Sequence, residues 1–199
     1  GNSYITESKE KNYTDLKKIT FMFFWLTGMC TSCFLGIFQP FMRLWVGEKF
    51  LMGFSVVVCL CAYFYLYETT RLLNVFKNDG GIWHEDRFRP LISAIVNLAL
   101  NLISVNYIGI YGIVLSTIVA LAVIEIPWLL QNIFTVMYDT SLFKDYFKMF
   151  VSWIIATVFS CVIIAVLTYK VTLSGWGAFA FFVVVSVLIP NIVFLLLMH

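Results

Sequence analysis

Six long apolar segments, separated by charged or turn-forming residues, set the strongest limit on how this chain can fold. Each is 17 to 23 residues long, and at 1.5 Å per residue helices of this length cross a hydrocarbon core of about 30 Å. Backbone groups in lipid must be paired internally, and the segments lack the ten-residue alternation of barrel strands. The sequence therefore predicts an all-α membrane protein with a bundle of six transmembrane helices. Their ranges are 19–38, 51–67, 91–107, 109–130, 151–168 and 176–198.

The composition excludes an ordinary soluble domain. Of the 199 residues, 61% are hydrophobic and 12% are charged, whereas soluble domains are nearer half apolar and about a quarter charged. The formal net charge of +2 indicates no class of partner, and we expect no nucleic-acid binding. Residues that favour turns separate the apolar segments. They are Pro40, the Asn-Asp-Gly-Gly at 78–81, Pro90, Gly109, Asp139 and the glycines of 175–177.

Lysine and arginine are distributed unevenly between the two sides of the predicted bundle. If the N-terminal tail faces the cytoplasm, the outer side holds only three of the thirteen basic residues, Arg43, Lys49 and Lys170. The inner side holds the other ten, which are Lys9, Lys11, Lys17, Lys18, Arg71, Lys77, Arg87, Arg89, Lys144 and Lys148. This positive-inside bias places both ends of the chain in the cytoplasm. The charged residues at 84–89 then anchor the third helix at the cytoplasmic face.

The start of the chain is polar and lacks the apolar stretch of a signal peptide. We expect residues 1–18 to be a cytoplasmic linker and the chain to be a piece of a longer transporter. In this division residues 19–130 form a four-helix part of a transporter lobe, residues 131–150 form a cytoplasmic loop, and residues 151–199 add two peripheral transmembrane helices.

Few residues could support catalysis. Cys30 and Cys33 have the two-residue gap of a redox or zinc pair, but they lie within an apolar segment without a second pair, so we predict that they are packing residues. The sequence His84-Glu85-Asp86 lacks a second group of ligands and is predicted to be solvated loop charge. None of the common catalytic or nucleotide-binding motifs occurs. We therefore expect a protein that is not an enzyme and needs no cofactor or metal.

Polar residues within the third segment are more informative. Ser93, Asn97 and Asn101 are spaced by four and share one face of a helix. An amide in hydrocarbon needs a partner on another helix or water in a cavity. We favour bonding between helices, and the alternative is the wall of a hydrophilic cavity.

Two further segments carry small residues at the same spacing of four, which allows a neighbouring helix to approach closely. We predict that both sets form packing faces. They are Gly28, Ser32 and Gly36 in the first segment, and Gly112, Ser116 and Ala120 in the fourth.

Three charged residues, one within the fourth segment and two just after the second, are candidates for a functional site. Glu125 is the carboxylate furthest inside any segment, about 24 Å from Gly109 at 1.5 Å per residue. Ionisable residues inside a membrane are functional candidates, so Glu125 is considered for gating or ion coupling, with a snorkelling interfacial position as the alternative. Glu68 and Arg71, three residues apart, are predicted to pair on one helix face. Arg71 is also considered for attracting a phosphate group.

Two stretches, "QPFMRLWVGEKFLMG" and "GIWHEDRFRPLISAIVNLALNLISVNYIGIYGIVLSTIVA", resemble the C-terminal half of bacterial Wzx-type polysaccharide flippases. These belong to the multidrug/oligosaccharidyl-lipid/polysaccharide exporter superfamily. The first stretch matches the family's pattern of a proline and an aromatic before a Leu-Trp-hydrophobic-Gly-Glu turn at Pro40, Phe41, Leu44, Trp45, Gly47 and Glu48. The second matches a Gly-aromatic loop, an Asp-Arg-aromatic-basic-Pro step, an asparagine in the next helix and a Gly-Ile-x-Gly helix start. The matching residues are Gly81, Asp86, Arg87, Phe88, Arg89, Pro90, Asn97, Gly109, Ile110, Gly112, Ser116 and Thr117.

The resemblance implies that the six helices are the C-terminal lobe of a two-lobed, fourteen-helix transporter in the bacterial cytoplasmic (inner) membrane. Such proteins flip undecaprenyl-diphosphate-linked oligosaccharide units to the outer leaflet by alternating access, in the biosynthesis of surface polysaccharides such as O-antigen or capsule. The implied partners are the lipid-linked oligosaccharide, membrane lipid and the missing N-terminal lobe of the same chain. The candidates for substrate binding or gating are Glu68, Arg71, Arg87, Arg89, Asn97, Asn101 and Glu125.

Two alternatives remain open. One is a membrane-embedded glycan polymerase or transferase, which would need catalytic acid or base groups in a loop, where this chain offers only residues 84–86. The other is a cation-coupled drug exporter of the same superfamily, which would share the fold.

Overall fold

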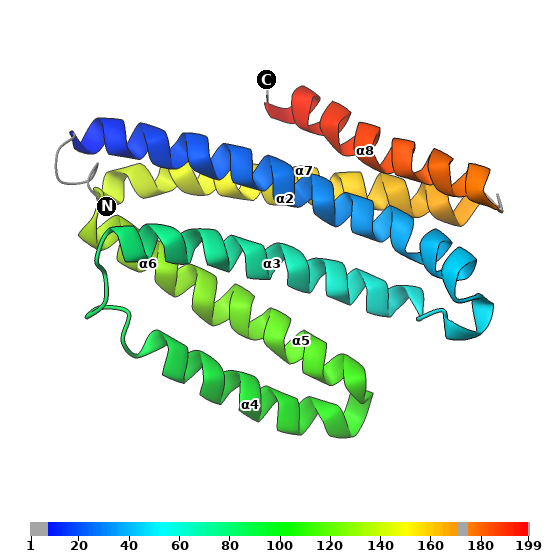
Figure 1. The fold of residues 1–199 in the computed structure, drawn as a ribbon. Helices are drawn as coiled ribbons and strands as arrows, with labels where there is room; N and C mark the ends of the chain where they lie inside the picture. Colours follow the sequence, from blue (N-terminus) through cyan, green and yellow to red (C-terminus); the bar gives the residue numbers. More distant parts are fainter. Residues whose placement is uncertain (1–7, 171–174, 199) are drawn as a thin grey trace. The chain divides into compact units, whose positions relative to one another are not determined.

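The structure is a computed structural model that describes residues 8–170 and 175–198. Within these residues there is no strand, and the helices are α2 (Lys9–Trp45), α3 (Phe54–Asp79), α4 (Arg89–Ile108), α5 (Ile110–Ala120), α6 (Ile126–Val136), α7 (Thr140–Lys170) and α8 (Trp176–Met198) (Figure 1). A short 3₁₀ turn, η1 (Glu48–Phe50), precedes α3, and a π-helical turn, η2 (Leu121–Glu125), joins α5 to α6.

The described residues form six helices that are long and apolar enough to cross a membrane, when α5, η2 and α6 are taken as one span. The predicted fold class, an all-α chain with six membrane-length helices, is therefore confirmed, and the chain is a multi-pass membrane protein. Two of the predicted breaks are also confirmed. Gly109, with φ of 58°, lies between α4 and α5, and Asp139 lies between α6 and α7.

Several helices extend beyond the apolar segments that predicted them. Residues 9–18 of the expected linker are the first turns of α2, while residues 1–7 lie outside the described residues. The expected loop over 131–150 is wrong, because only residues 137–139 separate α6 from α7. The Asp139 carboxylate accepts a hydrogen bond from the Ser141 backbone N–H at 2.9 Å and so caps α7. Tyr146 and Phe150, four residues apart, are buried and continue the apolar face of α7 towards this cap.

Pro40 does not end the first helix as expected. It lies inside α2, which continues to Trp45. A proline removes one backbone hydrogen bond from a helix, and membrane helices tolerate this loss where neighbouring groups compensate. Pro190 lies inside α8 in the same way.

The chain forms two compact units. The first contains residues 1–23 and 63–148, and the second contains residues 24–62 and 149–199. The helices α2, α3 and α7 each contribute one part to each unit.

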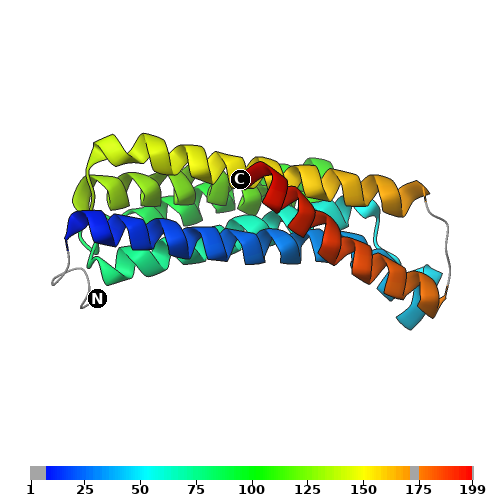
Figure 2. The ribbon, with the colours of Figure 1, turned by 90° about the horizontal axis from the view of Figure 1, so that it is seen from above.

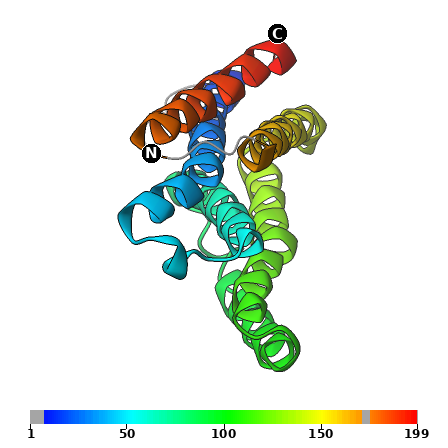
Figure 3. The ribbon, with the colours of Figure 1, turned by 90° about the vertical axis from the view of Figure 1, so that its right-hand side faces the viewer.

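In the first unit, α4 and α5 form an antiparallel hairpin, green in Figures 1 and 3. The predicted small-residue face of α5 packs against α4: a side chain at Gly112 would meet the Ser104 backbone at 2.7 Å, and Ser116 and Ala120 are buried. Elsewhere in this unit, an aromatic cluster surrounds Phe134, whose ring centroid lies 5.1 Å from that of Tyr146.

In the second unit, the predicted small-residue face of α2 packs against α7 and α8, whose course can be followed in Figure 2. A side chain at Gly28 would meet Thr157 of α7 and Phe194 of α8, and Ser32 between the glycines is fully buried. The prediction of a packing face is therefore confirmed for α2 as well.

Gly36 gives the sharpest test of this packing. A methyl group there would overlap the Ser186 hydroxyl and approach the Ile164 side chain to 2.7 Å, whereas one at Gly177 would meet nothing within 4 Å. We expect Gly36→Ala to lower the free energy of unfolding by about 1–3 kcal/mol through overpacking. Gly177→Ala, the matched control, is expected to leave it unchanged or raise it by up to about 1 kcal/mol. Denaturation of the full-length protein in detergent micelles measures both, and equal stabilities would contradict the packing described here.

Candidate functional site

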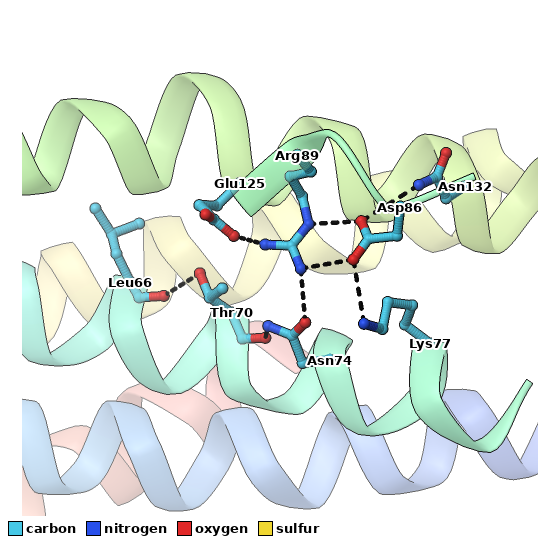
Figure 4. A network of polar contacts seen from close by, with 8 residues as sticks. All are labelled: Leu66, Thr70, Asn74, Lys77, Asp86, Arg89, Glu125 and Asn132. Atoms are coloured by element: carbon cyan, nitrogen blue, oxygen red, sulfur yellow. Dashed lines mark hydrogen bonds and ion pairs between the residues drawn. The ribbon is translucent and has the colours of Figure 1, made fainter. Parts of the chain in front are cut away.

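A cluster of buried and half-buried charged and amide side chains lies in the first unit, at the start of α4 (Figure 4). Its members come from four different parts of the chain: α3, the loop before α4, the first residue of α4, and the η2–α6 segment. We call it the charge cluster, and it consists of Asn74, Lys77, Asp86, Arg89, Glu125 and Asn132.

Arg89 is the centre of the charge cluster. Its Nε donates to Asp86 Oδ1 at 2.6 Å, and its Nη2 donates to Asp86 Oδ2 at 2.8 Å, so the guanidinium holds the carboxylate in a two-point contact. Nη2 also donates to Asn74 Oδ1 at 2.9 Å, and Nη1 forms an ion pair with Glu125. The side chain is only 6% exposed. One guanidinium thus joins α3, the loop before α4 and η2.

Asp86 is the second centre. Besides Arg89, it receives the Lys77 ammonium at 3.1 Å and the Asn132 amide at 3.5 Å. Burial alone would raise the pKa of this carboxyl, but the hydrogen bonds from Arg89 and Lys77 outweigh it, so the pKa lies below its ordinary value of 3.8. Asp86 is therefore ionised at neutral pH.

The local sequence explains how the loop delivers these groups. α3 ends at Asp79, and Gly81, with φ of 66°, turns the chain where a residue with a side chain would be strained. The Arg89 backbone N–H then donates to the Asp86 carbonyl at 3.2 Å, which brings the two side chains together at a spacing of three. Pro90 stands in the first turn of α4, where its missing N–H costs nothing.

Lys77 is held from a second side by an aromatic ring. Its ammonium lies 4.4 Å from the centroid of the Trp83 ring, in a cation–π contact. The Asn74 amide, which accepts from Arg89, donates in turn to the Thr70 carbonyl at 2.9 Å. The bonds therefore continue along α3 from the charge cluster.

The charge cluster is electrically balanced, since Lys77 and Arg89 offset Asp86 and Glu125. A balanced, buried set of this kind has no free cation to bind an anion and no unpaired carboxylate to act as a base. What it can do is hold α3, α4 and η2 in one arrangement, because removing one of its charged members takes an ionic partner from another.

The structure brings only two of the seven predicted candidates, Arg89 and Glu125, into the charge cluster. Glu68 and Arg71 form the predicted pair at 3.2 Å on α3, where the Arg71 side chain is 64% exposed. Arg87 is also exposed, contacts His84 Nε2 at 3.1 Å and stacks over the Phe88 ring.

Asn97 and Asn101 support the packing interpretation. Asn101 donates to Asn97 Oδ1 at 3.3 Å and accepts a hydrogen bond from the Ser116 hydroxyl of α5. Ser93, the third member of this stripe, is buried. Asn101 therefore joins the two helices of the hairpin, as predicted for bonding between helices.

Two expectations about the loop need correction. Asp86 was predicted to be solvated, but it is 3% exposed and bonded on all sides, while His84 and Glu85 are exposed as expected. Arg89 was predicted to be a surface anchor, but it is buried against Asp86 and Glu125. In both cases the physical reason is mutual: each charge supplies the partner that makes burial of the other tolerable.

Three members of the charge cluster, Asn74, Lys77 and Asn132, were missed. Lys77 and Asn74 lie at a spacing of three near the end of a helix, where polar side chains ordinarily face solvent. The one available signal was the Asp-x-x-Arg spacing of Asp86 and Arg89 directly before a proline.

The cysteines form no disulfide: all five, Cys30, Cys33, Cys59, Cys61 and Cys161, are free. In the second unit Cys33 contacts the Ser186 carbonyl at 3.4 Å, and Cys161 contacts the Ser32 hydroxyl at 3.7 Å. These contacts agree with the predicted packing role of Cys33.

Comparisons of the chain with models of protein families, with curated proteins and with solved structures give no match. Its function must therefore be inferred from its own residues.

Arg89 provides the first test of the charge cluster. We expect Arg89→Gln to lower the free energy of unfolding by about 3–5 kcal/mol, because it leaves the buried Asp86 and the half-buried Glu125 without their shared cation. The matched control is Arg87→Gln, two residues away and exposed, with an expected change within about 0.5 kcal/mol. Thermal or denaturant unfolding of the full-length protein in micelles measures the difference. If the two variants were equally stable, Arg89 would not be the centre of the cluster.

The lowered pKa of Asp86 gives a second test. A carboxyl whose pKa is depressed in the folded state stabilises fully above the unfolded value, ordinarily 3.8, and this stability is lost as the pH falls through the folded pKa. Between about pH 5 and about pH 2 we therefore expect the stability of the unmodified protein to fall more steeply than that of Asp86→Asn. Unfolding midpoints recorded across this range for the two proteins check this, and parallel curves would contradict it.

Proposed function

We propose that the chain is the C-terminal lobe of a transporter that flips undecaprenyl-diphosphate-linked oligosaccharide units across a bacterial cytoplasmic membrane. The observation that carries the proposal is the charge cluster: four ionisable groups, three of them buried, gathered among helices whose length and apolarity suit a membrane. Ionisable groups inside membrane proteins are costly and gather where substrates or ions pass or where helices rearrange. A protein that served only as an anchor would have no need of them.

The family-like motifs support the same proposal. Asp86, Arg89 and Pro90 belong to the Asp-Arg-aromatic-basic-Pro step that resembles the polysaccharide flippases, and the first two are the centres of the charge cluster. Gly109 and Gly112, from the Gly-Ile-x-Gly step, turn and pack the α4–α5 hairpin. These residues of the second stretch that carries the resemblance thus have a defined structural role in the first unit.

The proposed mechanism is alternating access. In it, the charge cluster keeps α3, α4 and η2 together in one of the transporter's states, and exchange of the Arg89–Glu125 pair accompanies the passage to another. Transitions of this kind move packed elements between discrete arrangements rather than deforming them continuously. The π-helical turn at Leu121–Glu125 supports such a role for Glu125, since turns of this type are frequent at functional sites.

The proposed orientation places the charge cluster and both ends of the sequence on the cytoplasmic side. The basic residues Lys9, Lys17, Lys77 and Lys144 then lie at the inner ends of α2, α3 and α7, in agreement with the positive-inside rule. The exposed Arg87 lies at the same end, where the diphosphate of a lipid-linked substrate enters. The remaining surfaces of the substrate path come from the N-terminal lobe of the same chain and from membrane lipid.

A deletion strain tests the proposed function. Loss of the full-length gene is expected to abolish surface glycan and to accumulate unflipped lipid-linked units in the inner leaflet. Units that reach the outer leaflet but stay unextended would instead indicate a polymerase, and unchanged glycan with increased drug sensitivity would indicate a drug exporter.

Complementation of that strain then tests the cluster. We expect Glu125→Gln to lower the rate of export roughly tenfold or more. A tenfold loss corresponds to a rise of about 1.4 kcal/mol in the free-energy barrier to transport. Arg43→Gln, which alters an exposed arginine of the second unit, is the control and should restore export fully. Unchanged export in Glu125→Gln, with normal protein levels, would remove Glu125 from the mechanism.

A further inference from the structure

One side of α3, where Tyr67 and Arg71 are exposed and Tyr63 and Glu68 are half-buried, is unsuited to hydrocarbon. Tyr63, Tyr67 and Arg71 follow one another at a spacing of four, so they share a side of the helix. Tyr67 is 44% exposed, and the Arg71 side chain is 64% exposed. Glu68, beside them, pairs with Arg71 at 3.2 Å. We call these four residues the α3 strip, and all of them belong to the first unit.

The α3 strip lies in the middle of its helix. α3 runs from Phe54 to Asp79, so Tyr67 stands at its midpoint. Tyrosine in membrane helices gathers at the interfaces, where its hydroxyl meets water, rather than at the centre. A charged residue near an end can extend its side chain to the interface, but Arg71 instead turns back to Glu68, one residue from the midpoint.

The neighbouring hairpin shows what a lipid-facing helix of this unit looks like. The exposed side of α4 carries Leu91, Ile95, Leu98 and Leu102, which are all aliphatic and all more than half exposed. Hydrocarbon suits that face and does not suit the α3 strip. The contrast indicates that the α3 strip faces water within the membrane.

The chemistry of the α3 strip selects among the parts of a lipid-linked oligosaccharide. An isoprenoid tail would be met by aliphatic side chains. A diphosphate would need a cation free of a counter-charge, whereas Arg71 is neutralised by Glu68. A sugar needs both a flat apolar surface for the C–H face of its ring and donors and acceptors for its hydroxyls. The Tyr63 and Tyr67 rings supply the surface, stacked with centroids 5.6 Å apart and an interplanar angle of 26°.

We propose that the α3 strip is a sugar-binding surface on a water-filled path, along which the glycan of the substrate passes. The tyrosine rings pack against the sugar rings, and the Glu68–Arg71 pair exchanges hydrogen bonds with their hydroxyls. This inference rests on the proposed function for the identity of the ligand. The water-facing position of the α3 strip does not depend on the proposed function.

The position of the strip can be tested without any substrate. In the full-length protein with its native cysteines replaced, we introduce Tyr67→Cys, Arg71→Cys or, as the control, Leu98→Cys, which is at least as exposed on α4 as Tyr67 is on α3. A membrane-impermeant maleimide is applied to whole cells and to inverted vesicles. A thiol reacts as its thiolate, which requires water, so the two strip positions are expected to be labelled about tenfold faster than Leu98→Cys from at least one side. Equal labelling of all three positions would overturn the inference.

The binding role is tested by export in the deletion strain, normalised to the amount of protein in the membrane. Tyr67→Ala is expected to lower the export rate roughly tenfold, while Tyr67→Phe, which keeps the ring, retains most of it. The control is Tyr107→Ala, which removes an exposed tyrosine from the end of α4 and should have no effect. Full export in Tyr67→Ala, or equal loss in Tyr67→Ala and Tyr67→Phe, would overturn sugar stacking. If the deletion itself left export unchanged, the proposed function would fall, and the labelling result would still decide the position of the strip.

Discussion

Hydrocarbon supplies no hydrogen-bond partner, and this constraint accounts for most of the structure. It makes helices the solution for each long apolar segment, since only a helix pairs every backbone group within the segment. It also decides what hydroxyl side chains do inside those helices. Thr31, Thr69, Thr117, Ser160 and Thr168 each donate to the carbonyl four residues earlier, and so none of these hydroxyls needs a partner outside its own helix.

Charged groups cannot be satisfied in this way, because one backbone carbonyl does not compensate a full charge. The chain meets the same constraint by gathering opposite charges from distant positions. Asp86 alone would be too costly to bury, and so would Arg89, but together with Lys77 and Glu125 they form a neutral set. The loop between α3 and α4 is held in place for this reason, because its buried carboxylate, Asp86, bonds to side chains of α3, α4 and α6.

The sequence predicted those features that repeat along one helix. The six spans follow from the length of apolar runs, the α2 and α5 packing faces follow from small residues four apart, and the Glu68–Arg71 pair follows from a spacing of three. Features that depend on distant residues were not accessible. Nothing near Lys77 indicates that Asp86 will lie 3.1 Å away, and nothing near Asn132 indicates a contact 46 positions earlier. The helix ends beyond the apolar runs were missed because charged and amide residues interrupt the runs there. Buried residues such as Leu16, Phe134 and Tyr146 nevertheless continue one face of each helix.

The π-helical turn at Leu121–Glu125 has a consequence for the direction of everything after it. Ser116 bonds to Asn101, and Asn132 bonds to Asp86, so both point towards α4 or the loop that leads into it. Sixteen positions separate them, and in a regular helix their side chains would diverge by about 160°. A π turn takes up one extra residue, which reduces this divergence to about 60°. The wider turn thus rotates the residues that follow it about the helix axis. Without this rotation, one uninterrupted span would not present Ser116 and Asn132 to the same side.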